Sequence, residues 1–282
     1  MSLSMLARLE ALALEAGQMI LHIRERGASV GHKDDGSPVT DADRLAEDLI
    51  VRGLEKIDPR IPIIAEERIQ YGGVPDNPDQ MFFLVDPLDG TKEFVQGRTD
   101  FTVNICLVEY GLPRLGVVLA PARNELFSGD SHSAFRCRIS PDGRRLTERK
   151  AIRTSTPREV LRGVASASHA CVETTRLLER FAVDEIASIG SSLKFCLLAA
   201  GEADIYPRIG RTMQWDTAAG DAILRSAGGC TLRFDGQPLN YGPSCPGPSA
   251  YANPHFVSFA GRAAVLRSML LNHEASVATG TA

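Results

Sequence analysis

The chain has 282 residues, of which 44% are hydrophobic and 23% are charged, as is ordinary for a globular protein. That length is sufficient for one large domain or for two packed lobes. The net charge of −4 gives no support for nonspecific nucleic-acid binding, which depends on an excess of Lys and Arg. No apolar run approaches the roughly 18 residues that a membrane-spanning helix needs.

The cysteines indicate a reducing compartment. Six of them are scattered along the chain without a C-x-x-C pair, and Cys106 lies in an apolar run. Reduced thiols are therefore favoured over disulfides or zinc ligands. The first residues lack the basic and apolar parts of a signal peptide. We expect a cytoplasmic protein, with association at a membrane surface and formation of a homodimer both left open.

Apolar residues with helical spacing predict two helices near the N-terminus, over residues 4–26 and 43–57. A short apolar run at 61–65 then leads to Glu66 and Glu67, and residues 70–80 have the composition of a loop. Further strand-like runs, broken by turn residues, predict an antiparallel meander. These runs are 101–109, 114–120 and 125–128.

The second half of the chain alternates between strand-like and helix-like segments. These segments are 163–166, 171–182, 185–189, 192–200, 203–206 and 216–227. The polar, basic stretch 139–158 is the best candidate for a lobe boundary. We therefore predict a layered α/β (α+β) sandwich. Its parts would be a mixed α+β lobe over 1–150, an α/β lobe over 151–270 and a disordered tail over 271–282.

The most informative segment is Asp86-Pro87-Leu88-Asp89-Gly90-Thr91, which follows an apolar run. Because Pro87 cannot donate to a sheet ladder, we expect the chain to leave the sheet at Asp86, where open α/β sheets bind ligands. The two carboxylates repel each other unless a cation or a shared proton lies between them, and Mg²⁺ prefers such oxygen ligands. Backbone N–H groups after Gly90 favour an anion. The segment predicts a metal-plus-phosphate site, with a plain turn as the alternative.

Three other acidic segments support this interpretation. Glu66 and Glu67 end an apolar run, where they face either a metal or solvent. Asp216 precedes a small-residue helix that Gly228 and Gly229 close, so we expect it at the N-cap. Asp43 also opens a helix, where it either caps the helix or orients a hydroxyl group or a water molecule.

In the order T-D-A-D-R, A-E-E, D-P-L-D-G-T and W-D-T-A-A-G-D, these segments closely resemble the inositol-monophosphatase-like superfamily of Mg²⁺-dependent, lithium-sensitive phosphatases. The resemblance spans about residues 5 to 262 and implies the fold of that superfamily. It implies that two or three Mg²⁺ are held by the carboxylates of Glu66, Asp86, Asp89 and Asp216, and by the Leu88 carbonyl. It also implies that Thr91 hydrogen-bonds Asp43, and that this pair and Glu66 hold a metal-bound water for in-line attack. Backbone N–H groups of Gly90 and Thr91 would hold the phosphate.

Other stretches resemble the 3'(2'),5'-bisphosphate nucleotidases of the CysQ type. They are G-S-S-L-K-F-C at 190–196, Y-P-R at 206–208, S-A-S-H at 166–169 and K-E-F at 92–94. The guanidinium of Arg208 stands where inositol monophosphatases have an acid, and it suits a second phosphate. The resemblance implies hydrolysis of 3'-phosphoadenosine 5'-phosphate (PAP) to AMP, with its sulfated form (PAPS) as a further substrate, in sulfate assimilation. The implied substrate contacts are Gly90, Thr91, Ser168, His169, Ser191, Ser192, Lys194, Arg208 and Asp216.

Several alternatives stay open at this point. The same metal core serves an inositol-1-phosphate or fructose-1,6-bisphosphate phosphatase, and a non-catalytic nucleotide or metal sensor is the alternative of another class. Lys194 can be solvated, His169 can be a surface or capping residue, and Arg208 can be a structural ion-pair partner. A haloacid-dehalogenase-like phosphatase is excluded, because its two acids are two positions apart and those of this chain are three apart.

Overall fold

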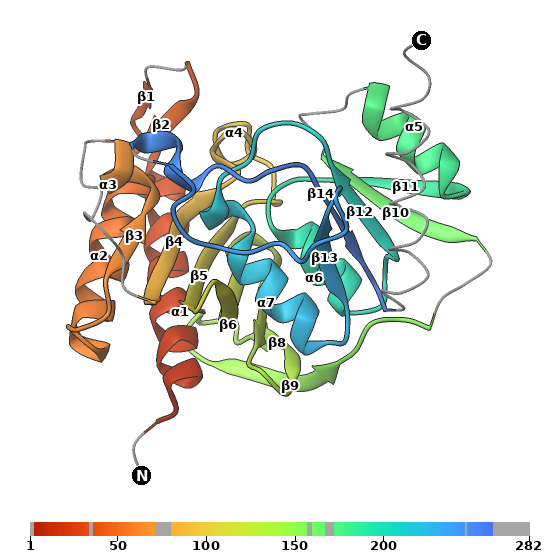
Figure 1. Cartoon of the computed structure of the whole chain (residues 1–282). Coiled ribbons are helices and arrows are strands. Elements are labelled where there is room, and N and C mark those ends of the chain that lie inside the picture. The colour runs from red at the N-terminus through yellow and green to blue at the C-terminus, as the bar shows by residue number, and fades with distance from the viewer. Residues whose placement is uncertain are drawn as a thin grey trace.

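The computed structural model describes residues 3–33, 36–70, 80–156, 160–166, 172–245 and 247–261. Helices and sheets alternate in layers across the molecule (Figure 1). Two N-terminal helices cover one face of a seven-stranded sheet, and two further helices separate that sheet from a five-stranded sheet with one more helix beyond it. The predicted layered α/β fold is confirmed. The division into two lobes remains a prediction, and the tail 271–282 lies outside the described residues.

The first layer consists of the long helices α1 (Met5–Arg26) and α2 (Asp41–Ile57). Ser4 caps the start of α1, and Gly27, with a φ of 85°, ends it. A capping box between Thr40 and Asp43 starts α2 two residues earlier than the sequence pattern predicts. A short hairpin joins the two helices, formed by β1 (Val30–His32) and β2 (Pro38–Thr40).

The seven-stranded sheet has the order β3-β4-β5-β6-β7-β8-β9, and only the β3–β4 pair is parallel. Its strands are β3 (Ile63–Ala65), β4 (Met81–Asp89), β5 (Thr102–Glu109), β6 (Leu112–Ala120), β7 (Glu125–Gly129), β8 (Ala134–Ile139) and β9 (Leu146–Ile152). The predicted meander is confirmed, and β9 extends it into the polar stretch 139–158. That strand is hard to see in the sequence because it is an edge strand with mostly exposed polar residues.

The expectation that the chain leaves the sheet at Asp86 is wrong. Strand β4 continues to Asp89, which pairs with Thr102, while Asp86 pairs with Asn104. Two residues of β4, Pro87 and Leu88, therefore stand opposite one residue of β5, as in a β-bulge. The bulge accommodates the missing N–H of Pro87, and it lets two acidic residues remain on one strand.

The five-stranded sheet has the order β11-β10-β12-β14-β13, with β10 parallel to both of its neighbours. Its strands are β10 (Leu161–Ser166), β11 (Val183–Ile189), β12 (Ile205–Arg208), β13 (Cys230–Arg233) and β14 (Phe256–Phe259). Helices α6 (Leu193–Ala199) and α7 (Ala218–Ser226) lie between the sheets, and α5 (Val172–Arg180) packs on β11 and β12. The short helices are α3 (Glu66–Gln70), α4 (Thr91–Val95), η1 (Pro121–Arg123), η2 (Gln214–Asp216) and η3 (Pro248–Tyr251).

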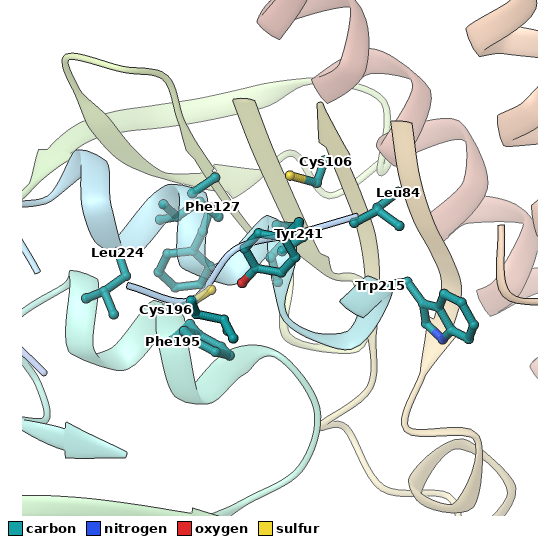
Figure 2. Packing of buried hydrophobic residues seen from close by; sticks show 14 of the residues in the cluster. Leu84, Cys106, Phe127, Phe195, Cys196, Trp215, Leu224 and Tyr241 are labelled. Carbon is teal, nitrogen blue, oxygen red and sulfur yellow. The ribbon is translucent and has the colours of Figure 1, made fainter. Parts of the chain in front are cut away.

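The largest hydrophobic core joins the two sheets through α6 and α7 (Figure 2). Phe127 from the seven-stranded sheet, Phe195 from α6 and Leu224 from α7 all belong to it. This packing fixes η2 and the start of α6 relative to the end of β4.

The five cysteines that the structure describes have free thiols. Across the described ranges, no helix combines the length and apolarity needed to cross a membrane.

Candidate active site

The acidic motif, Asp86 to Asp89, forms the end of β4, and a turn at Gly90 follows it. Leu88 N donates to Asp86 Oδ1 over 3.0 Å, which fixes the carboxylate inside the bulge. Gly90 has a φ of 93°, and a Cβ on it would lie 3.2 Å from the backbone oxygen of Asp100. Only glycine fits this turn without strain, and the turn starts α4 at Thr91.

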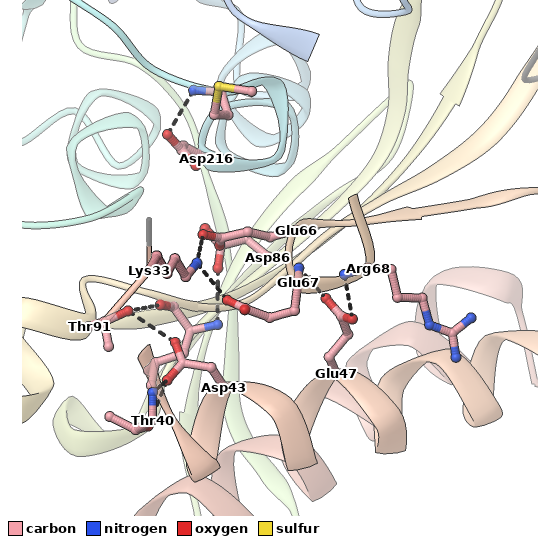
Figure 3. Close-up of polar contacts among 12 residues, drawn as sticks. Lys33, Thr40, Asp43, Glu47, Glu66, Glu67, Arg68, Asp86, Thr91 and Asp216 are labelled. Carbon is pink, nitrogen blue, oxygen red and sulfur yellow. Dashed lines mark hydrogen bonds and ion pairs between the residues drawn. The ribbon is translucent and has the colours of Figure 1, made fainter. Parts of the chain in front are cut away.

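Thr91 and Asp43 meet as the resemblance implies (Figure 3). Thr91 Oγ1 lies 3.0 Å from Asp43 Oδ1 and 3.2 Å from the Leu88 carbonyl oxygen, and it can donate to either. Asp43 Oδ2 accepts from Thr40 N at 2.7 Å and from Thr40 Oγ1 at 2.6 Å. Burial raises the pKa of Asp43, and the hydrogen bonds from Thr40 oppose that rise. Asp43 therefore does both things considered from the sequence, since one oxygen caps α2 and the other binds Thr91.

Glu66 and Glu67 hold a lysine that the sequence analysis did not single out. Lys33 Nζ lies 2.6 Å from Glu66 Oε1 and 2.7 Å from Glu67 Oε1 (Figure 3). Burial lowers the pKa of Lys33, but the charges of the two glutamates outweigh burial and raise it. Glu67 is only 3% exposed, so it does not face solvent. Its position is fixed from behind by Glu47, which accepts from the Glu67 N–H at 2.7 Å.

The predicted ligand carboxylates interact as a cluster of like charges. Burial raises the pKa of Asp86, and the charges of Glu66, Asp89 and Asp216 raise it further. Burial also raises the pKa of Asp216, with Asp89 and Glu66 adding to the rise. Such a cluster needs protons or cations for stability. Among the described residues, no three acidic, His or Cys side chains already converge around one point as ligands do around a bound ion.

Asp216 is placed differently from the expected helix cap. It ends η2, its Oδ2 accepts from Met213 N at 2.9 Å, and Thr217 takes the N-cap position of α7. The expectation that Asp216 caps this helix is wrong, because a turn of 3₁₀ helix comes first. The second acid of the W-D-T-A-A-G-D segment, Asp221, is fully buried and accepts from Thr231 and Tyr241.

One cavity of about 250 Å³ brings residues from both sheets together. Its lining includes three of the predicted carboxylate ligands, one of which, Asp216, is also a predicted substrate contact, and five further predicted substrate residues. These are Glu66, Asp89 and Asp216, and Gly90, Thr91, Ser191, Lys194 and Arg208. Four basic side chains, Lys33, Lys92, Lys194 and Arg208, also line the cavity, and the last two are predicted substrate residues. The cavity therefore combines a cluster of acids with basic side chains.

The basic part of the cavity has donors that the fold leaves incompletely paired. Arg208 is only 7% exposed, and its Nη2 donates to the Arg211 carbonyl at 2.8 Å. In the described part of the chain, neither Arg208 Nε nor Ser191 Oγ finds a hydrogen-bond partner, although both are buried. Ser191 also has a φ of 52°, which is rare for a residue other than glycine. Strain and unpaired donors at one place are typical of a ligand site.

Lys194 lies beside these donors, and its Nζ donates to the Ser191 carbonyl at 2.6 Å and to the Ile189 carbonyl at 3.2 Å. Burial lowers the pKa of Lys194 to about 8, and Arg208 contributes to the decrease while Asp89 opposes it. Ser192 is 2% exposed and does not line the cavity. Ser168 and His169 lie outside the described residues, so their predicted contacts stay predictions.

Comparisons with known proteins identify the family to which the chain belongs. The model of the inositol monophosphatase family matches residues 3–262, and the chain belongs to that family. The chain is 40% identical over 256 residues to the 3'(2'),5'-bisphosphate nucleotidase CysQ of Escherichia coli (strain K12). The aligned region covers 89% of this chain and 98% of that protein. The CysQ of Buchnera aphidicola subsp. Acyrthosiphon pisum is 41% identical over 239 residues, covering 84% and 87%.

A solved structure supports the same assignment. The crystal structure of CysQ from Bacteroides thetaiotaomicron has a TM-score of 0.72 and 34% sequence identity to this chain, covering 91% of this chain and 97% of that one. The resemblance predicted from the acidic segments is confirmed at the level of the family. Members of this family are generally metal-dependent phosphatases.

Proposed function

We propose that the chain is a Mg²⁺-dependent phosphomonoesterase that removes the 3'-phosphate of PAP to give AMP and phosphate, and that also accepts PAPS. The observation that carries this proposal is the cavity that combines the acidic cluster with Lys194, Arg208 and Ser191. A monophosphatase needs only the acids, whereas a substrate with a second phosphate also needs the basic side chains. The similarity to 3'(2'),5'-bisphosphate nucleotidases of the CysQ type supports the same substrate class.

The donor set fits Mg²⁺ in its chemistry. Glu66, Asp86, Asp89 and Asp216 supply carboxylate oxygens and Leu88 supplies a carbonyl, and all of these are hard ligands of the kind that Mg²⁺ prefers. Two or three ions, as the family resemblance implies, would offset the mutual repulsion of the acids. When bound, Mg²⁺ would supply positive charge to the reacting phosphate and lower the pKa of water.

Thr91 and Asp43 would orient the attacking water. When Thr91 donates its only hydroxyl proton to Asp43 Oδ1, its oxygen is left as an acceptor. A water molecule that donates to Thr91 Oγ1 then has a lone pair free to attack phosphorus. As that bond forms, the bond from phosphorus to the ribose 3'-oxygen would break, and the 3'-oxygen would take up a proton from water. Glu66 borders the same cavity and would hold the second proton of that water. The chain thus supplies a proton-accepting path without a covalent phosphoenzyme.

The second phosphate would lie at the basic part of the cavity. Arg208 has an unpaired Nε, and a guanidinium binds a phosphate through parallel hydrogen bonds. Ser191 Oγ and Lys194 Nζ would add two further donors. Gly90 and Thr91 would present backbone N–H groups to the phosphate that is cleaved. We also propose that Ser168 and His169 contact the nucleotide, and that the protein is cytoplasmic.

The test compares PAP with adenosine 3'-monophosphate, which lacks the 5'-phosphate. We expect the wild-type kcat/KM to be roughly 100-fold higher for PAP, since two charge-assisted contacts are lost with the monophosphate. Arg208→Gln should remove most of this preference and leave the monophosphate rate nearly unchanged. Arg211→Gln is the matched control, because the exposed Arg211 side chain is not required for the carbonyl contact with Arg208. Equal wild-type rates on both substrates would contradict the proposal.

A further inference from the structure

A buried hydrogen-bond network connects two predicted metal ligands that come from different parts of the fold. Asp89 ends β4 in the seven-stranded sheet. Asp216 ends η2, which follows β12 of the five-stranded sheet along the chain. Ser192, directly before α6, touches both of them. Its Oγ lies 3.0 Å from Asp89 Oδ2 and 2.6 Å from the Asp216 carbonyl oxygen.

Asn104 supports Ser192 from the neighbouring strand. Asn104 Nδ2 donates to Ser192 Oγ at 2.8 Å and lies 3.5 Å from Asp89 Oδ2. Ser192 has one hydroxyl proton, so it donates either to Asp89 or to the Asp216 carbonyl while it accepts from Asn104. The Asp89 carboxylate is therefore held from both the strand side and the helix side.

The burial of Asn104 is not explained by stability alone. Asn104 is 1% exposed and lies between the apolar residues Val103 and Ile105 of β5, and within the described residues its Oδ1 has no hydrogen-bond partner. A buried carbonyl oxygen without a partner destabilises a fold relative to an apolar side chain of similar shape. Asn104 is therefore unfavourable for folding, yet it is hydrogen-bonded to Ser192 and to the predicted ligand Asp89. Proteins retain such a residue where it serves the function of a site.

We propose that Asn104 and Ser192 are a positioning pair that fixes Asp89 relative to Asp216 for cation binding. The inference rests on the proposed function, and it gives Ser192 a role behind the ligands in place of a direct substrate contact. Neither side chain lines the cavity, so neither needs to touch the substrate. Residues that orient metal ligands from behind typically change metal affinity by about 10- to 100-fold when they are replaced.

The test measures Mg²⁺ binding directly, by calorimetric titration of the EDTA-treated full chain. The fluorescence of Trp215, the single tryptophan, gives a second readout next to Asp216. We expect Asn104→Leu to weaken Mg²⁺ binding about 10-fold or more while the melting temperature in EDTA stays equal or rises. Ser192→Ala should weaken binding in the same direction, and the double variant should be little worse than either single variant.

The control is Cys106→Ala, which also changes a buried side chain of β5 but has no bond to Asp89. It should lower the melting temperature and leave Mg²⁺ affinity unchanged. At saturating Mg²⁺, the KM for PAP should remain near wild type in Asn104→Leu and Ser192→Ala.

Two results would overturn the inference alone. They are unchanged or tighter Mg²⁺ binding by both variants, or a loss of affinity that merely follows a loss of stability, as a purely structural role predicts. An increased KM for PAP in Ser192→Ala with normal Mg²⁺ affinity would return Ser192 to the substrate site. A wild-type chain that does not bind Mg²⁺ would overturn the proposed function as well.

Discussion

Thr91 Oγ1 lies 3.0 Å from Asp43 Oδ1, although 48 positions separate the two residues in the sequence. Thr91 starts α4 directly after the acidic motif, and Asp43 lies in the first turn of α2. The contact therefore ties the expected water-binding residue to the first layer of the fold. Asp43 is 2% exposed, so the acceptor for the threonine proton is shielded from bulk water.

Replacing Thr91 tests the proton path. Thr91→Val keeps the shape of the side chain and removes the hydroxyl, so kcat should fall by about 10²- to 10⁴-fold with the fold intact. Thr91→Ser retains the hydroxyl and should keep most of the turnover. The measurement is steady-state phosphate release, with circular dichroism to check folding. Normal turnover by Thr91→Val would remove Thr91 from the mechanism.

Lys194 predicts a dependence of substrate binding on alkaline pH. Because its pKa is lowered to about 8, the side chain is mostly charged near neutral pH and mostly neutral one unit above 8. The charged form attracts the second phosphate, so the KM for PAP should rise by about tenfold from roughly pH 7 to roughly pH 9. Lys194→Met should abolish this rise. Adenosine 3'-monophosphate serves as the control, and a KM for it that rises equally would contradict the assignment of Lys194.

Asp89→Asn tests whether the acidic cluster binds cations. The raised pKa of Asp89 means that its ionised form is disfavoured in the folded chain, so the neutral Asn should be at least as stable in EDTA. Mg²⁺ at about 100 times its Kd should stabilise the wild type by about 2.7 kcal/mol. The variant should lose most of this gain and nearly all turnover. Thermal unfolding with and without Mg²⁺ measures both effects, and an undiminished Mg²⁺ shift in the variant would exclude Asp89 as a ligand.

Glu47 predicts a change of stability with pH. Burial raises its pKa to about 7, and the charge of Glu67 contributes. The folded chain therefore binds more protons than the unfolded chain between the unperturbed value of 4.5 and about 7, so the free energy of unfolding should fall as the pH rises through that window. Glu47→Gln should flatten this part of the profile. Urea unfolding in EDTA measures it, with Glu55→Gln, at an exposed position of α2, as the control. An unchanged slope in Glu47→Gln would contradict the account of this residue.

The sequence was most informative where chemistry and backbone constraints coincide. The D-P-L-D-G-T segment predicted a site at the end of an apolar strand, and Gly90 and Thr91 stand where the turn requires them. Helices α1 and α2 were predicted because their caps and apolar spacing are local features. The contact between Thr91 and Asp43 came from the family resemblance, since no local pattern places side chains from distant segments together.

Other features depend on tertiary structure that no short segment records. The bulge at Pro87 lets β4 continue to Asp89, which the conformational preference of proline alone does not predict. Lys33 lies in a polar loop and is recognisable only once Glu66 and Glu67 are seen beside it. Asn104 did leave a signal, as a single amide among the apolar residues of β5, but its partner Ser192 is far away in the chain.

The most direct measurement is phosphate release from PAP, inositol 1-phosphate and fructose 1,6-bisphosphate in parallel, each with Mg²⁺ and with EDTA. We predict strong preference for PAP, dependent on Mg²⁺ and absent in EDTA. Inositol 1-phosphate lacks a second phosphate for the basic part of the cavity, and fructose 1,6-bisphosphate lacks the nucleoside that Ser168 and His169 would contact. Preference for inositol 1-phosphate or fructose 1,6-bisphosphate would retain the metal site and contradict the nucleotidase assignment. Turnover of none of the three would contradict the enzymatic account as a whole.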